Sequence, residues 1–424
     1  MLYHFVRPLA KIALKTHFRK IYFSNADRIP WDKPVILAVN HPTSFVEPCM
    51  LAAFLPKSLY FLARGDLFKK PFYAKILESL HILPVFRLKD GGYGKIKQNY
   101  TTLTRCFDAL NEQKTILIMA EGSCIQEKRL RPLRKGTARL AFGTYEKYPD
   151  LDIQIVPIGV NYTYPDEFRS EAMFDFGEPI AVRDYVETYQ KNTNEGYRLL
   201  TEELEKCLRK RIVVINEEAD EPLVENLLTL YRTDHPDELL PLLSDTEDRL
   251  QNEVRMAKQV HEMAPSVKQH LSKLTHTYFS QLKSHEITDD SLKRSAFANT
   301  SNLIILMTGF IPFLIGYIGN YIPVRYAQHV METKVKDVED KISVALVVAI
   351  AGYLLYYLGL VIFGFVINSM AFWILLAMLP VWGFFALVYR EFYAKYKNAK
   401  KVSKLNPDLR VELQRMRGEI LDKI

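Results

Sequence analysis

Cysteine is scarce in this sequence, and the motifs that usually accompany it are absent. The 424 residues include four cysteines, Cys49, Cys106, Cys124 and Cys207, with no C-x-x-C pair and no histidine at metal-ligand spacing. A disulfide framework and a metal site are therefore not expected, and reduced thiols in a cytosolic setting fit the pattern best. No redox cofactor is expected either.

Further absences narrow the class of protein. The first 20 residues lack the uninterrupted apolar run and the small-residue cleavage site of a signal peptide. No G-x-S-x-G nucleophile elbow occurs, which argues against a serine hydrolase. The net charge of +7 is modest, and its local excess, ten Lys/Arg against five Asp/Glu over residues 390–424, follows directly on apolar segments. We therefore expect no nucleic-acid partner.

Charge is also missing from three long segments. Leu303–Val324, Ile342–Ile367 and Met370–Tyr389 contain no charged residue, and each is about as long as the ~20 residues that an α-helix needs to cross a bilayer. Residues 301–389 are therefore predicted to be embedded in a membrane. Residues 390–424 are predicted to form a basic cytoplasmic tail.

The side on which each part lies limits the number of membrane crossings. The basic tail and a domain with reduced thiols both belong in the cytoplasm, which requires an even number of crossings. The first apolar segment is interrupted by Pro312, Gly316, Gly319 and Pro323, so we expect it to enter the membrane and return. The other two segments then form a spanning hairpin that turns at Asn368-Ser369.

The N-terminal part of the chain alternates short apolar runs with helical stretches, which is typical of an α/β domain. The candidate strands are Val35–Val39, Leu59–Ala63, Ile82–Phe86, Ile116–Ala120, Ile153–Val160 and Met173–Gly177, and the candidate helices are 48–55, 71–80, 94–112 and 135–147. We predict a basic amphipathic helix over 1–20, an α/β domain over 21–185 and a helical region over 186–300. The first helix either lies in a membrane interface or packs on the domain.

A histidine follows the first of these apolar runs. Val35–Val39 ends at Asn40-His41-Pro42, and Pro42 suits the first position of a helix, so His41 is predicted on a strand-to-helix turn. Glu47 follows within two helical turns. The two residues are either a general base with the group that orients it, or a loop histidine beside a solvated carboxylate.

Polar groups follow two more of the apolar runs. Arg87 comes at the end of Ile82–Phe86, and its planar fork suits a phosphate or a carboxylate. Glu121-Gly122-Ser123 follows Ile116–Ala120, and the glycine lets the backbone approach a ligand closely. These positions, just after a strand, are where α/β domains gather their sites. Surface residues at strand ends are the alternative.

A basic loop precedes a helix expected to open near Gly136. Its cationic residues are Lys128, Arg129, Arg131, Arg134 and Lys135. Basic side chains beside a helix N-terminus form an anion site, although a solvated charged loop has the same composition. The next apolar run, Val156–Gly159, contains a proline and a glycine, which indicates an edge strand, a bulge or the close approach of a ligand.

These features occur in an order that resembles the four blocks of the glycerolipid acyltransferase family, also called the lysophosphatidate or PlsC-type acyltransferases. His41 with its downstream carboxylate resembles the His-x4-Asp block, and Ile82–Arg87 resembles the second block. Ala120–Ser123 with Pro132–Gly136 resembles the Pro-Glu-Gly-Thr block and its trailing Pro-Phe-Lys-x-Gly. Val156–Gly159 resembles the fourth, proline-containing block.

The resemblance covers about residues 20–185 and departs from the family pattern at several positions. The family's Asp falls on Val46, and the carboxylate is Glu47, one position later and one methylene longer. Ala120 stands where proline is usual, and Ser123 stands where threonine is usual. Glu47 is therefore the candidate replacement for the family Asp.

The resemblance implies a mixed sheet flanked by helices, and a membrane-bound O-acyltransferase of phospholipid biosynthesis. Such an enzyme transfers a fatty acyl group to a hydroxyl of glycerol 3-phosphate or lysophosphatidate. His41 and Glu47 are then the catalytic pair, with Glu121 on a glycerol hydroxyl. The residues expected to bind substrate are Arg87, Glu121, Gly122, Ser123, Lys128, Arg131, Arg134 and Lys135. Backbone N–H groups near Gly122 or in the 40–43 turn are the candidate oxyanion donors.

The expected partners are membrane lipids and an activated acyl donor. Acyl-CoA, acyl carrier protein and acyl phosphate are the candidate donors, so acyl carrier protein is a candidate protein partner. Two other functions stay open. One is acyl transfer to another lysophospholipid or to an amino-acid lipid, and the other is a non-catalytic membrane protein that retains the fold and binds lipid.

Overall fold

The computed structural model describes residues 2–86, 98–165 and 167–423. The chain divides into two compact units, and both are assembled from separate chain segments. The first unit comprises Met1–Val214, Leu239–Val254 and Val335–Val347, and the second comprises Ile215–Glu238, Arg255–Lys334 and Val348–Ile424. The domain boundaries given above, which follow the order of the chain, stay predictions.

The first unit is built on a mixed sheet with the strand order β4-β3-β5-β2-β6-β7-β1-β9. The strands are β1 (Lys20–Ser24), β2 (Val35–Val39), β3 (Leu59–Arg64), β4 (Ile82–Val85), β5 (Thr115–Met119), β6 (Gln154–Tyr162), β7 (Glu171–Phe176), β8 (Ile180–Ala181) and β9 (Leu243–Ser244). Neighbours from β4 to β6 are parallel, β7 and β8 pair antiparallel with β6, and β1 runs parallel to both β7 and β9.

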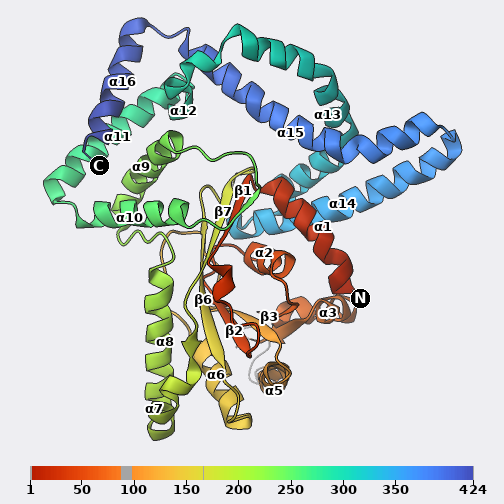
Figure 1. Cartoon of the computed structure of the whole chain (residues 1–424), viewed down its shortest axis with the longest axis vertical. Coiled ribbons are helices and arrows are strands. Elements are labelled where there is room, and N and C mark those ends of the chain that lie inside the picture. The colour runs from red at the N-terminus through yellow and green to blue at the C-terminus, as the bar shows by residue number, and fades with distance from the viewer. Residues whose placement is uncertain (1, 87–97, 166, 424) are drawn as a thin grey trace. The chain divides into compact units, whose positions relative to one another are not determined.

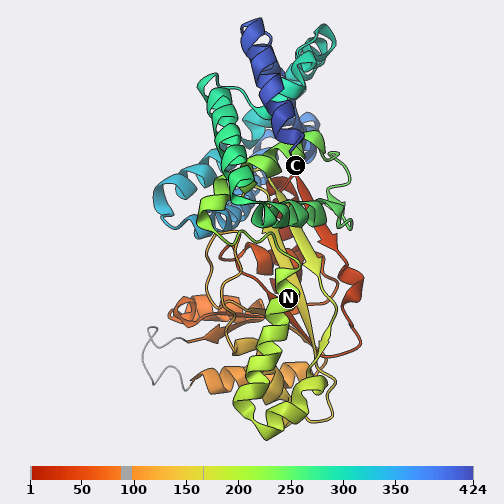
Figure 2. The same cartoon turned by 90° about the vertical axis from the view of Figure 1, so that its left-hand side faces the viewer.

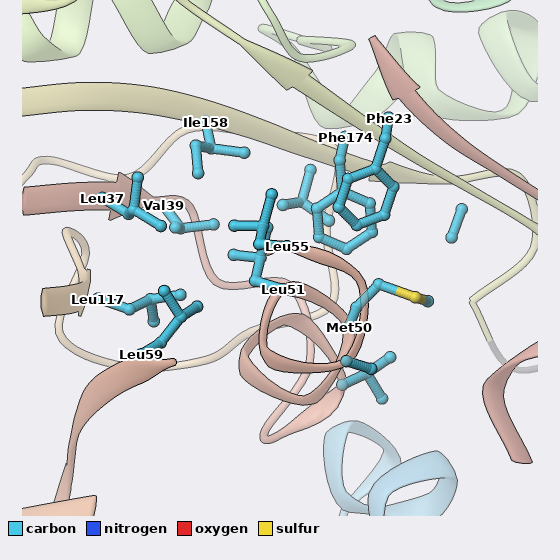
Figure 3. Packing of buried hydrophobic residues seen from close by; sticks show 14 of the residues in the cluster. Phe23, Leu37, Val39, Met50, Leu51, Leu55, Leu59, Leu117, Ile158 and Phe174 are labelled. Atoms are coloured by element: carbon cyan, nitrogen blue, oxygen red, sulfur yellow. The ribbon is translucent and has the colours of Figure 1, made fainter. Parts of the chain in front are cut away.

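Helices cover both faces of this sheet because its central strand is apolar on both faces. Val35, Leu37 and Val39 of β2 belong to one buried cluster, and Ile36 and Ala38 belong to the other. The first cluster, part of which is shown in Figure 3, includes residues of α1 (Leu2–His17) and α2 (Val46–Phe54). The second includes residues of α5 (Gln98–Asn111), α6 (Gly136–Lys147) and α8 (Thr193–Arg209). Figure 2 shows α8 in front of the strands.

The predicted mixed sheet flanked by helices is confirmed, with all six predicted strands within two residues of their expected bounds. The sequence-based prediction missed β1, which begins at the last residue of the helix expected over 1–20; that helix in fact ends at His17. It also missed β8 and β9, which have two residues each. The unit also contains α3 (Pro71–Ser79) and α7 (Val186–Lys191).

The second unit is helical (Figure 1). Its elements are α9 (Glu221–Asp234), the last part of α10 (Asp248–Glu262), α11 (Pro265–Ser284), α12 (Asp289–Lys293), α13 (Thr300–Lys334), most of α14 (Val338–Ile367), α15 (Met370–Val402) and α16 (Pro407–Leu421). The tail helix α16 is tied to α9 and α12 through Arg417, whose guanidinium lies 2.8 Å from carboxylate oxygens of Asp234 and Asp289. The tail therefore packs on the helices that precede the apolar segments.

Among the described residues, three helices, α13, α14 and α15, are long and apolar enough to cross a membrane. The expected interruption of the first is wrong, because α13 is one continuous helix that includes Pro312 and Pro323. A proline inside a helix leaves the carbonyl four residues earlier without its usual donor. For Pro323 this carbonyl is that of Gly319, and the hydroxyl of Tyr356 on α14 donates to it over 2.9 Å. A neighbouring helix thus supplies the missing hydrogen bond, which is how prolines are tolerated in membrane helices.

Glycines bring α13 and α15 into close contact. A Cβ at Gly316 would lie 2.0 Å from the carbonyl oxygen of Trp382, and one at Gly319 would lie 2.2 Å from Leu379. Where there is no hydrophobic effect to drive helices together, such small residues let backbones approach and gain van der Waals contact. This packing requires glycine at the point of closest approach.

Substitution of Gly316 by alanine tests this packing. The added methyl group has no space, so we expect a loss of about 1–3 kcal/mol of stability and a fall in the midpoint of thermal unfolding of about 2–4 °C for each kcal/mol. The measurement is the loss of helical circular dichroism of the detergent-solubilised protein on heating. Gly359→Ala on α14 is the matched control, because a Cβ there meets nothing within 4 Å. Equal midpoints for the two variants would contradict the tight contact.

Candidate active site

Two turns meet at the carboxyl edge of the parallel strands. β2 and β5 are adjacent and parallel, so the turns that follow Val39 and Met119 leave the sheet at the same edge. The N–H of Ile125 donates to the His41 carbonyl over 3.3 Å, and the Ser44 Oγ lies 3.5 Å from the Cys124 Sγ. The histidine turn and the Glu-Gly turn therefore lie side by side.

Asn40 fixes the start of the histidine turn. Its side-chain amide makes a pair of hydrogen bonds like those between strands. Nδ2 donates to the carbonyl of Val160 over 2.9 Å, and Oδ1 accepts from the N–H of the same residue over 2.6 Å. Asn40 is buried, and Val160 belongs to β6, the neighbour of β2. The amide thus extends the β2–β6 ladder by one step and determines where His41 begins to leave the sheet.

The structure brings His41 and Glu47 together. Nδ1 of His41 lies 3.4 Å from Oε2 of Glu47, and neither atom has another hydrogen-bond partner in the described part of the chain. The His41 side chain is 13% exposed, whereas that of Glu47 is 0% exposed. A histidine that presents one nitrogen to a buried carboxylate and keeps an edge at the surface can exchange a proton there with a bound molecule.

Glu47 lies in the first turn of α2, where the helix dipole favours a negative charge. Its Oε1 accepts three hydrogen bonds: from the N–H of Thr43 at 3.0 Å, the Thr43 hydroxyl at 2.7 Å and the Tyr162 hydroxyl at 3.0 Å. Val46, at the position of the family Asp, is instead fully buried in the apolar cluster. The longer glutamate side chain therefore reaches the place facing the imidazole from the next residue along the helix.

The buried carboxylate affects the ionisable groups around it. Burial and the charge of Glu47 raise the pKa of Tyr162 well above its ordinary value, so this hydroxyl remains a proton donor. Burial, followed by the Glu47 charge, raises the pKa of Cys49 to about 12. Cys49 is therefore a neutral thiol and a poor nucleophile at physiological pH.

Glu121 lies on the other side of the histidine turn. Its Oε1 accepts from the backbone N–H of His41 over 2.9 Å, and its Oε2 accepts from Nε of Arg131 over 2.8 Å. Arg131 also donates to the Ser123 Oγ over 2.9 Å and to the Ser123 carbonyl. Both oxygens of this buried carboxylate are thus already engaged in holding the turns. The predicted contact of Glu121 with a glycerol hydroxyl stays a prediction.

The rest of the basic loop leads into the N-terminus of α6. Arg134 and Lys135 are exposed just before Gly136, the first residue of the helix, and Lys128 is half-buried. The exposed cations and the helix N-terminus together favour an anion. Arg87 lies outside the described residues.

Gly122 has a φ of +73°, in the left-handed region that glycine adopts without a steric penalty. Its N–H donates to the Met119 carbonyl over 3.1 Å. The N–H groups of His41 and Thr43 donate to Glu121 and Glu47, respectively. These three N–H groups are therefore engaged within the protein, and an oxyanion role for backbone donors in the two turns stays a prediction.

Sequence reasoning missed three supporting residues of this site. Thr43 is two residues from the histidine, and its hydroxyl donates to Glu47 four residues later. Asn40 could also have been predicted, because an amide directly after an apolar run can hydrogen-bond to a neighbouring strand. Tyr162 is 115 residues away from Glu47 in sequence and contacts it only because β6 lies beside β2.

Comparison with known proteins agrees with this geometry. Residues 20–161 match the model of the Acyltransferase family. Over 150 residues the chain is 31% identical to glycerol-3-phosphate O-acyltransferase 1 of Saccharomyces cerevisiae, an alignment that covers 34% of this chain and 20% of the yeast protein. Over 117 residues it is 30% identical to glycerol-3-phosphate O-acyltransferase 2 of the same yeast, covering 27% of this chain and 16% of that protein.

These matches to residues 20–161 support the glycerolipid acyltransferase family that the sequence blocks predict. The chain spans about a fifth or less of the length of these curated relatives. Among solved structures, the lysophosphatidate acyltransferase PlsC from Thermotoga maritima aligns with 48% of this chain and 77% of its own, at 15% identity and a TM-score of 0.36. A similarity of that size supports no further conclusion.

The protonation of Cys49 gives a test of the buried carboxylate. With a pKa of about 12, roughly one thiol in 10,000 is ionised at pH 8, so alkylation of Cys49 by iodoacetamide should be far slower in the folded protein than in urea. Glu47→Gln should speed it, because the negative charge that disfavours the thiolate is removed. Mass spectrometry of the peptide that contains Cys49 measures both rates. An equal rate with and without urea would contradict the neutral, shielded thiol.

Proposed function

We propose that this protein is a membrane-bound O-acyltransferase that moves a fatty acyl group from an activated donor to a hydroxyl of glycerol 3-phosphate or lysophosphatidate. The observation that carries the proposal is the His41–Glu47 pair, 3.4 Å apart, in a domain that belongs to the glycerolipid acyltransferase family. The expected donor is an acyl thioester or an acyl phosphate.

In this mechanism His41 is the general base. With the Nδ1 proton directed at Glu47, the other ring nitrogen, Nε2, has a lone pair that accepts the proton of the acceptor hydroxyl as its oxygen attacks the acyl carbonyl. Glu47 holds the tautomer and stabilises the imidazolium that forms. The proton then passes to the departing thiolate or phosphate. The acceptor oxygen is itself the nucleophile, so no protein nucleophile is required.

The acceptor phosphate is assigned to the start of α6. Arg134 and Lys135 are exposed there, and a phosphate between them would also face the N–H groups of the first helical turn. Arg131 serves mainly as support, since Glu121 and Ser123 already accept from its guanidinium. This arrangement favours a phosphate-bearing acceptor over an uncharged one.

Alanine substitution of His41 tests the activity. Removal of a general base should lower kcat for acyl transfer by roughly 10²–10⁴-fold, with a similar loss for Glu47→Ala. The assay uses purified protein in lipid vesicles with acyl-CoA and acyl phosphate as alternative donors, and it compares glycerol 3-phosphate with lysophosphatidate. His285→Ala, an exposed histidine in the second unit, is the matched control. Full activity of both the His41 and Glu47 variants would overturn the catalytic assignment of the pair, whereas a wild type without acyl transfer would leave lipid binding without turnover.

Chain connectivity supports a membrane topology for this enzyme. Val335–Val347, which contains the beginning of α14, is part of the first unit, so we take the C-terminal end of α13 to be cytoplasmic. Arg417 ties the tail to Asp289, just before α13. In the described residues before Thr300 no helix is long and apolar enough to cross. We infer that α13 stays in the membrane without crossing and that α14 and α15 form the hairpin, with the domain and tail in the cytoplasm.

Cysteine labelling tests this topology. Single cysteines introduced at exposed positions in 326–337 and in the tail should react with a membrane-impermeant maleimide only from the cytoplasmic side, whereas one at Asn368 should react from the opposite side. Sealed vesicles of both orientations separate the two cases, with the tail position as an internal control. Labelling of residues 326–337 exclusively from the outer side would contradict the proposed path.

A further inference from the structure

The turn between β2 and α2 needs acceptors for its backbone N–H groups. After Asn40 it carries four such groups, those of His41, Thr43, Ser44 and Phe45, because Pro42 has none. The first two donate to Glu121 and Glu47, as described above. The other two donate to residues that lie about 300 positions later in the chain. A distant segment of the chain therefore supplies the acceptors for two of these four N–H groups.

The remaining acceptors come from the beginning of α14. The N–H of Ser44 donates to the Glu339 carbonyl over 3.1 Å, and the N–H of Phe45 donates to Oγ of Ser343, also over 3.1 Å. The hydroxyl of Ser44 donates to the carboxylate of Asp340. All of these residues belong to the first unit. Phe45 is the N-cap of α2 and makes no side-chain cap of its own. The Ser343 hydroxyl thus accepts from the N-cap N–H, which the side chain at the third helical position does in a capping box.

Apolar packing seats this part of α14 on the domain. Ile342 is 4% exposed and belongs to the same buried cluster as Val46 and Met50 of α2. Ser343 beside it is 8% exposed. A serine hydroxyl buried with a backbone N–H as its partner is expensive to displace, since either group left alone would lose its hydrogen bond without regaining water. The beginning of α14 is therefore held on α2 both by the packing of Ile342 and by the hydrogen bond of Ser343.

We propose that Asp340 and Ser343 are positioning residues of the active site. They fix residues 44 and 45, and through them the relation of Thr43 and Glu47 to His41, so that the imidazole meets the acceptor hydroxyl in a reactive orientation. This inference rests on the proposed acyl transfer for its kinetic consequence. Its structural consequence, the protection of the Ser44 and Phe45 amides, is independent of any activity.

The test combines kinetics with hydrogen exchange on the full-length protein in lipid vesicles. Ser343→Ala should lower kcat by about 10- to 100-fold, because small displacements of reacting groups carry penalties of that order, and it should leave KM nearly unchanged. Amide exchange in the peptide that contains residues 41–47 should become faster by on the order of 10-fold. Ser343→Thr keeps the hydroxyl and should restore both values toward those of the wild type.

Asp340→Ala provides a second variant at a less buried position, and it should show smaller changes in the same direction. The matched controls are Ser369→Ala, which removes a serine before α15 that makes no cap hydrogen bond, and Asp337→Ala, which removes an exposed carboxylate from the same segment as Asp340. Both controls should match the wild type in kcat and in exchange of residues 41–47.

The outcomes separate this inference from the proposed function. Unchanged exchange of residues 41–47 in Ser343→Ala and Asp340→Ala would overturn the positioning role, whether or not kcat falls. Faster exchange with an unaltered kcat would also overturn it. If wild type and His41→Ala transfer acyl groups equally poorly, the proposed function fails, and faster exchange in the two variants would then support a purely structural attachment in place of catalytic positioning.

Discussion

The Glu47 carboxylate is completely buried, so the protein itself must supply the hydrogen-bond donors that water would otherwise provide. Burial of an unpaired charge is far too unfavourable to persist, yet three hydrogen bonds to one oxygen and an imidazole facing the other meet the need. These groups come from three places in the fold: Thr43 in the turn after β2, Tyr162 on β6, and His41 itself. The sheet order that puts β6 beside β2 is therefore as necessary to the site as the histidine.

The residues around His41 and Glu47 are likewise held by hydrogen bonds that match buried donors with acceptors. A second buried carboxylate, Glu121, accepts from the backbone of His41 and is itself neutralised by Arg131. Both glutamates hold the histidine turn: Glu121 through the backbone of His41, and Glu47 through Thr43 and the imidazole. Of the basic residues expected to bind phosphate, Arg131 is thus bound into this framework, whereas Arg134 and Lys135 remain at the surface. In this loop the mostly buried Arg131 supports the turns, whereas the exposed Arg134 and Lys135 are available to attract an anion.

Much of this could be predicted from the sequence, and the reasons for success and failure are physical. Strands such as Val35–Val39 and the uncharged membrane segments carry their signal locally, in apolar runs of characteristic length. His41 and Glu47 are only six residues apart, so their proximity could also be predicted from the local sequence. Tyr162 and Ser343 could not be found, because their roles depend on contacts that the chain makes only after folding. The continuity of α13 through Pro323 likewise depends on a hydroxyl from another helix.

The attachment of α14 to the catalytic turn bears on how this domain can be divided or transplanted. The family match ends at residue 161, yet two amides beside the catalytic pair are satisfied from residues 339 and 343. A fragment cut at the family boundary would expose those amides, and with them the apolar surface that Ile342 covers. The part of the chain that must stay together is therefore larger than the segment that matches the family model. A transplanted domain would have to include residues 339–343 or receive other acceptors for the Ser44 and Phe45 amides.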